Sequence, residues 1–478
     1  MCTWLTNSTA LPHCNISCYF PSICKVPGPK WAKITDLYSA YHSLRGTLHI
    51  RTLQAHDKYG SVIRLGPNEL GFNSAEALKD LFIKNVQKSK GYAALVTTPG
   101  VHNVHNAVDF SIHKHKRSVV SKGFSIPSLL AFEPTMISTI NLLIQNLVKT
   151  SIKSESQNNW LTPINMGTSF KHMSFDVMGE FGFGQSFNLQ TSSENHFLFG
   201  IIPGILTRGG ILLQCQAFQK IGIERIFYRK VHTAVRKYHS TVSKLVADRL
   251  KEDKNAKSDL FSFIFDAQYS NNGKHEDIKT MMISELFTDS GFLLAASSDT
   301  SSTTLSALLF YLSRYPKCYE KVTTEIRSSF SSLSEIHSGP KITSFKHLRA
   351  CIEEALRMSP SLGSDSREKF VLGASQSMEK IEEMKMVFAP FSLGLRGCPG
   401  KLMAYMEMGI MMAKMLFCFY FRRPGNGLGE VEEGVLGDEG GRGRINEFQL
   451  MEHLASTHVG PYAEFRLRNG LKAEFEGF

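Results

Sequence analysis

The chain has few of the features that mark several common classes of protein. Its nine cysteines are odd in number and sparse beyond residue 24, which favours a reducing compartment without a disulfide framework. No block of Lys and Arg is interleaved with aromatic residues, so no nucleic-acid partner is expected. No internal repeat is visible.

Residues 1–24 also lack the features of a membrane anchor. A span needs about 20 mostly apolar residues, and polar residues interrupt this stretch throughout. No basic segment precedes an apolar run, so it is a poor signal peptide. Its four cysteines and His13 match no zinc spacing. We expect an unstructured leader, whose sequons at Asn7 and Asn15 matter only if it is lumenal.

What the chain does have is enough apolar sequence for a large core. Of its 478 residues, 42% are hydrophobic and 10% are aromatic, which excludes a disordered or fibrous protein. The net charge of +11 leaves two interpretations open. One is an acidic partner or an anionic membrane surface, and the other is a diffuse charge that serves solubility.

The hydrophobic pattern predicts a mainly α fold with a small β portion. A rigid turn at Lys25–Lys30 begins the folded region, and Tyr59–Phe72 alternates like a β-hairpin. An exposed loop is expected over 423–445 and a β-like tail over Thr457–Leu467. Amphipathic periodicity indicates helices over 129–150, 229–252, 279–314, 316–330 and 345–358.

Two apolar stretches have the length of a membrane span, Phe287–Tyr311 and Leu402–Phe421. The first contains Asp289 and Asp299, and the second contains Glu407 and Lys414. Because charged residues inside a bilayer are costly, both stretches are better interpreted as buried helices of a large α-rich core.

The most informative segment is Phe391–Gly400, which reads F-S-L-G-L-R-G-C-P-G. It places Cys398 in a glycine-rich loop directly before a long apolar helix. Glycines allow the backbone to approach the sulfur closely. Backbone N–H groups and the start of the following helix stabilise negative charge on sulfur. The alternative for a lone cysteine is a buried, inert thiol.

This decapeptide resembles the haem-binding loop of the cytochrome P450 monooxygenases, F-x-x-G-x-R-x-C-x-G, at every defined position. The resemblance covers about residues 25–470 and implies the cytochrome P450 fold, with haem b between the central helix and the cysteine loop. It implies that Cys398 is the axial iron ligand, that Arg396 pairs with a haem propionate and that Phe391 shields the thiolate.

A second resemblance lies upstream, where Glu354-Ala355-Leu356-Arg357 fits the family's E-x-x-R. Side chains three residues apart share a helix face and can pair. By itself this spacing is also common in surface salt bridges. In the family the pair stabilises the proximal side of the haem pocket.

A third resemblance lies in the long helix. Ala296–Ser301 is similar to the oxygen-activation motif A/G-G-x-D/E-T-T, with Ser297 at the usual glycine. The resemblance implies that the Thr300 hydroxyl interrupts the helical hydrogen bonding and assists oxygen activation, while Asp299 supplies protons. The alternative is a Ser/Thr-rich helix that only packs.

The segment His113–Arg117 resembles the W/H-x-x-x-R helix that crosses the haem, which implies that His113 and Arg117 reach the propionates. For the intervening Lys114, His115 and Lys116 we expect a solvated basic patch that meets the reductase.

Together the resemblances imply a monooxygenase that hydroxylates or epoxidises an apolar small molecule with O2. Electrons would come from NADPH through cytochrome P450 reductase at the endoplasmic reticulum surface. The segments Leu308–Pro316 and Asn446–Leu450 resemble those of fungal members that act in secondary-metabolite biosynthesis, mycotoxins among the products. Without a clear membrane span, a cytosolic or peripheral location is the other expectation. The expected pocket segments are Tyr92–Val108, Phe197–Leu213 and Phe292–Ala296.

The chain departs from the family between Arg357 and Cys398, which are only 41 residues apart. Typical members have an interval roughly twice as long, so segment 361–385 is shortened. Arg367 is the only stand-in for the arginine that completes the Glu354–Arg357 pair, and without it a buried charge network would be incompletely satisfied. The alternative function is therefore a catalytically impaired or inactive relic or isoform.

Overall fold

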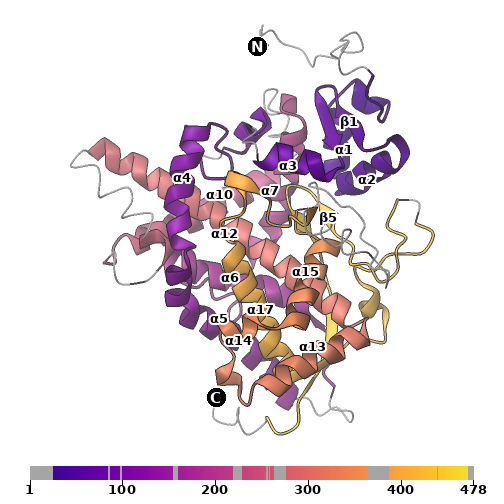
Figure 1. Ribbon diagram of the computed structural model, residues 1–478. Helices are drawn as coiled ribbons and strands as arrows, with labels where there is room; N and C mark the ends of the chain where they lie inside the picture. Colours follow the sequence, from indigo (N-terminus) through magenta and orange to yellow (C-terminus); the bar gives the residue numbers. More distant parts are fainter. Residues whose placement is uncertain are drawn as a thin grey trace.

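The computed structural model describes residues 25–83, 87–96, 100–153, 160–218, 229–253, 257, 259–262, 276–362, 387–438 and 440–471. Helices predominate in these residues and the strands are short (Figure 1), which confirms a mainly α fold with a small β portion. The predicted leader over 1–24, most of the shortened segment 361–385 and Arg367 lie outside the described residues.

All five helices that the periodicity predicts are present, with ends displaced by a few residues, and others were not predicted. The α-helices are α1 (Leu37–Leu44), α2 (Leu48–Tyr59), α3 (Ala75–Ile83), α4 (Phe110–Gly123), α5 (Ile126–Lys153), α6 (Met166–Phe183), α7 (Phe197–Gln214), α10 (Arg229–Arg249), α12 (Glu276–Leu312), α13 (Pro316–Ser329), α14 (Pro340–Thr343), α15 (Lys346–Met358) and α17 (Lys401–Cys418). Short 3-10 helices are η2 (Trp31–Lys33), η3 (Lys90–Leu95), η4 (Leu333–Glu335), η5 (Gly394–Arg396) and η6 (Gly427–Glu430).

In the part of the chain that the structure describes, the strands form three small antiparallel sheets. The predicted hairpin is β1 (Val62–Gly66) paired with β2 (Glu69–Phe72), with an irregularity between Arg64 and Gly66. The expected β-like tail supplies β6 (Ser456–Thr457), which pairs with β5 (Met451–Glu452), and β7 (Tyr462–Leu467). In the third sheet β7 lies between β3 (Ile164–Asn165) and β4 (Phe419–Arg422).

Local sequence explains where the helices around the pocket begin and end. At the start of α4, the Asp109 carboxylate accepts hydrogen bonds from the N–H groups of Ser111 and Ile112, which have no partner within the helix. Asn165 caps α6 through the N–H of Thr168. Gly184 ends α6 in the left-handed conformation, at a φ of 62°.

The core forms where α12 packs against α6, α15 and α17 (Figure 1). A run of side chains in α17 is completely or almost completely buried: Met408, Ile410, Met411, Met412, Met415, Leu416 and Phe417. Both apolar stretches with the length of a membrane span therefore belong to buried helices, as their charged residues indicated.

Two other described helical segments are long and apolar enough to cross a membrane, Ile126–Ser151 of α5 and Phe197–Gln214 of α7. Only their length and composition suggest a membrane span, and the core helices of soluble proteins meet the same criterion. In this fold α5 packs on α6 and α17, and α7 packs on α1 and η3.

Candidate functional site

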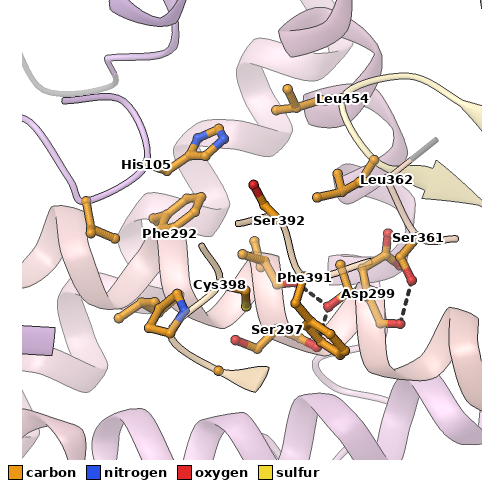
Figure 2. A pocket seen from close by; sticks show the side chains of 18 of the residues that line it. His105, Phe292, Ser297, Asp299, Ser361, Leu362, Phe391, Ser392, Cys398 and Leu454 are labelled. Carbon is orange, nitrogen blue, oxygen red and sulfur yellow. Dashed lines mark hydrogen bonds between the residues drawn. The ribbon is translucent and has the colours of Figure 1, made fainter. Parts of the chain in front are cut away.

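A cavity of about 650 Å³ separates α12 from the Cys398 loop. Figure 2 shows Cys398, Phe391 and Ser392 on the loop side, facing Phe292, Ser297 and Asp299 of α12. All three segments expected to form the pocket contribute to its lining: 95–96 and 103–106, residues 205–206 and 208–209 of α7, and 291–293 and 295–296 of α12.

Backbone hydrogen bonds hold the Cys398 loop in place. The Cys398 N–H donates to the Phe391 carbonyl over 2.8 Å, and the Gly397 N–H donates to the Gly394 carbonyl over 3.1 Å. Gly394 has a φ of 67°, and a side chain there would overlap the carbonyl oxygen of Phe82 in α3. The glycine-rich sequence is therefore a steric requirement at Gly394.

The Cys398 sulfur is accessible from the cavity. Burial raises the pKa of this thiol, while hydrogen bonds from the N–H groups of Gly400 and Lys401 and the charge of Arg117 oppose that rise. The groups predicted to stabilise a thiolate are thus in place at the start of α17. Phe391 lines the cavity, and its ring centroid lies 5.3 Å from that of Tyr405 in α17.

Three nitrogen-bearing side chains predicted to meet propionates line the same cavity: Arg396, Arg117 and His113. Arg396 donates to the carbonyls of Ala107 and Val108 over 2.9 and 3.0 Å, and Arg117 donates to that of Gly397. Among the described residues, neither guanidinium forms a salt bridge with a carboxylate.

Electrostatics around these groups favour an anionic ligand. Burial lowers the pKa of both Arg117 and Arg396. Burial, together with Arg396, Lys88 and Arg117, lowers the pKa of His113 to about 4. A group with two carboxylates would compensate the two guanidinium charges, and a metal opposite Cys398 would take the thiolate. The residues present therefore fit a haem.

On the opposite wall, Asp299 is buried and its Oδ2 has no hydrogen-bond partner among the described residues. Burial raises the pKa of Asp299 to about 6, although Lys171 opposes the rise. The Thr300 hydroxyl donates to the Ala296 carbonyl over 2.9 Å. α12 is regular α-helix throughout this segment, so the predicted interruption at Thr300 is wrong. The hydroxyl is satisfied inside an intact helix turn.

The predicted Glu354–Arg357 pair forms on α15. Two hydrogen bonds of 2.7 and 2.6 Å join the guanidinium to both carboxylate oxygens. The expectation of an incompletely satisfied buried network is wrong, because the Glu354 side chain is 44% exposed and water can solvate it. Hydrogen bonding to Glu354 raises the pKa of Arg357.

The basic patch on α4 is smaller than predicted. Lys114 and His115 are exposed, as expected. Lys116 is buried instead, and its Nζ lies 2.8 Å from Asp289 and 3.3 Å from Glu285 of α12. Position in the helix explains the difference, since Lys116 follows the buried His113 by three residues and shares its inward face.

Sequence reasoning missed several residues of the cavity wall. Tyr238 of α10 lines it and donates from its hydroxyl to the Gly291 carbonyl of α12 over 2.6 Å. Leu454 and Ala455, from the turn between β5 and β6, also reach the cavity. Only the periodicity of α10 could have suggested Tyr238, and no local signal marks Leu454.

Comparison with known proteins agrees with this geometry. The family model described as Cytochrome P450 matches residues 26–370 and 376–436. The cytochrome P450 monooxygenase apf7 of Gibberella fujikuroi is 28% identical over 94% of both chains. The cytochrome P450 monooxygenase AKT7 of Alternaria alternata is 29% identical over 94% of this chain and 93% of its own. A cytochrome P450 monooxygenase of Gibberella zeae is 30% identical over 80% of this chain and 96% of its own.

Proposed function

Since the chain belongs to the cytochrome P450 family and is a haem-dependent monooxygenase, we propose that it hydroxylates or epoxidises an apolar small molecule in fungal secondary metabolism. The observation that carries this proposal is the Cys398 thiol at one wall of a cavity with a largely apolar lining. The fungal source of the similar monooxygenases supports the metabolic assignment.

The cofactor of this proposal is haem b, held by residues of the Cys398 loop and α4. Cys398 would provide the thiolate ligand of the iron, and Arg396, Arg117 and His113 would bind the propionates. Phe391, which lines the same cavity, would shield the thiolate from water. When bound, haem supplies the redox chemistry that activates O2, whereas the protein supplies binding, orientation and protons.

Asp299 and Thr300 are the proposed proton-handling residues. With a pKa of about 6, the Asp299 carboxyl holds a proton in an appreciable fraction of molecules near neutral pH. Asp299 lines the cavity, and its buried Oδ2 has no hydrogen-bond partner among the described residues, so a small movement of the side chain would let the carboxyl pass its proton to water in the cavity. The Thr300 hydroxyl donates its proton to the Ala296 carbonyl of the same helix. Toward a ligand its oxygen can therefore act only as an acceptor, unless the hydroxyl rotates and breaks that hydrogen bond.

Family members generally take electrons from a redox partner, and we propose NADPH–cytochrome P450 reductase for this chain. Lys114, which is exposed on α4, would contribute positive charge to the surface that meets this partner. We further propose peripheral association with the endoplasmic reticulum membrane. The exposed apolar side chains of Trp31, Leu37 and Tyr41 support that location.

A carbon monoxide difference spectrum of the reduced, purified protein tests the site. We expect the red-shifted Soret band typical of thiolate-ligated haem, and we expect Cys398→Ala to abolish it. The matched control is Cys318→Ala, because Cys318 is exposed on α13 and does not line the cavity.

A soluble, folded protein that lacks this band would contradict the proposed monooxygenase activity and favour the alternative of an inactive relic. A band that survives in Cys398→Ala would instead show that the axial assignment is wrong.

A further inference from the structure

His105 lines the cavity between α12 and the Cys398 loop, and its side chain is held between two aromatic rings. Its imidazole stacks on the ring of Phe292 of α12, with ring centroids 5.0 Å apart and planes at 8° (Figure 2). The ring of Tyr92 meets its edge at 5.3 Å. Two aromatic contacts from different elements therefore fix the orientation of the imidazole.

The backbone around His105 is equally well held. Lys88 donates from Nζ to the His105 carbonyl over 2.6 Å, and the His105 N–H donates to the Asn103 side chain over 3.0 Å. Asn106 donates from its amide to the Leu95 carbonyl and accepts from the Asn103 N–H. Both side-chain oxygens and the Asn106 side-chain nitrogen therefore bond to the loop itself.

The imidazole nitrogens, by contrast, form no hydrogen bond with any residue that the structure describes. Burial and the nearby charge of Lys88 lower the pKa of His105 to about 3, so the ring is neutral at physiological pH. A neutral imidazole offers one N–H donor and one acceptor. The lining of the cavity as a whole is largely apolar and includes Leu95, Val96, Phe292, Leu206 and Leu454.

We propose that His105 determines specificity by forming one hydrogen bond with an uncharged oxygen group, a ketone or a hydroxyl, on an otherwise apolar substrate. This inference rests on the proposed function and names the substrate class of the same site. A preorganised polar group in an apolar wall discriminates strongly, because a substrate without the matching group leaves it unpaired.

Equilibrium binding of 2-decalone and decalin to the haem-loaded protein tests the proposal, because these bicyclic molecules have similar shapes and differ by one carbonyl. Binding is followed by the Soret shift and independently by calorimetry. We expect the ketone to bind about five- to tenfold more tightly than the hydrocarbon.

Variants then assign that preference to a residue. His105→Phe preserves the aromatic stack and should remove the preference, whereas His105→Gln should retain most of it. His115→Phe makes the same substitution on the exposed face of α4 and should bind both molecules as the unmodified protein does.

The proposal is overturned if the unmodified protein binds both molecules equally, or if His105→Phe keeps the preference. It is also overturned if decalin-2-carboxylate binds more tightly than the ketone, since that would indicate a cationic site. The carbon monoxide spectrum of each variant reports separately on the haem-thiolate centre. Loss of that spectrum would contradict the proposed function, and calorimetry would still measure the ketone preference.

Discussion

Gly394 and Gly400 lie on either side of Cys398 in the loop, and a side chain added at each position would have different surroundings. Gly394 combines a φ of 67° with a close approach to the Phe82 carbonyl. At Gly400 an added Cβ would lie 3.5 Å from the Phe124 ring and 3.8 Å from the Cys398 sulfur, which are ordinary contacts. Only the first of these glycines is required by the backbone.

We therefore expect Gly394→Ala to destabilise the loop by about 1–3 kcal/mol and to lower haem retention. Gly400→Ala is the matched control and should keep both properties near those of the unmodified protein. The haem-to-protein absorbance ratio and the midpoint of unfolding measure the two effects. Equal behaviour of the two variants would refute the steric argument.

At the scale of elements, the contact between α4 and α12 depends on a buried ion pair. Lys116 and Asp289 have side chains only 5% and 2% exposed, so neither is compensated by water. Burial raises the pKa of Asp289, while the charge of Lys116 opposes the rise. This pair positions the helix that carries His113 and Arg117 against the wall that carries Asp299.

Lys116→Met should lower the free energy of unfolding by about 3–5 kcal/mol, because it leaves the Asp289 charge buried without its partner. Protonation of Asp289 would reduce this loss at low pH. Lys114→Met, two residues earlier on the exposed face, should change stability by less than about 0.5 kcal/mol. Urea unfolding of both variants measures the two changes in stability. Similar midpoints would mean that the Lys116–Asp289 pair contributes little to the stability of the fold.

At the scale of the whole molecule, one carboxyl joins three core helices. Glu407 of α17 is buried and accepts a hydrogen bond of 2.6 Å from Ser174 of α6. Ser301 of α12 provides a second hydrogen bond. Burial raises the pKa of Glu407 to about 7 despite these two bonds.

This raised pKa makes the stability of the fold depend on pH. The folded state keeps the Glu407 proton up to about pH 7, whereas the unfolded chain releases it near the ordinary glutamate pKa of 4.5. The unfolded state is therefore favoured progressively as pH rises from about 4.5 to 7. Glu407→Gln removes this ionisation from both states.

Relative to Glu407→Gln, we expect the unmodified protein to lose about 2–3 kcal/mol of stability between pH 5 and pH 8. Urea unfolding of both proteins at the two values measures the difference, in which the other titrating groups cancel. The control is Glu320→Gln on the exposed face of α13, which should show no such trend. A pH-independent difference for Glu407→Gln would mean that this carboxyl is ionised in the fold.

The sequence predicted much of this molecule because its strongest signals are local. A thiolate loop needs its glycine, arginine and cysteine at fixed spacing, and an amphipathic helix needs a regular apolar face. For these reasons the cysteine loop, the Glu354–Arg357 pair and the five clearest helices could all be located without coordinates. Short helices such as α1 and α3 were missed because their periodic patterns are too brief.

The mainly α class, the Cys398 loop and the cavity-lining residues of α4 and α12 could all be predicted from the amino-acid sequence alone. The burial of Lys116 against Asp289, the half-exposed Glu354 side chain and the contribution of Leu454 to the cavity became apparent only from the three-dimensional structure. Burial and pairing depend on segments that are distant in sequence, and a local pattern carries no information about which of them will meet.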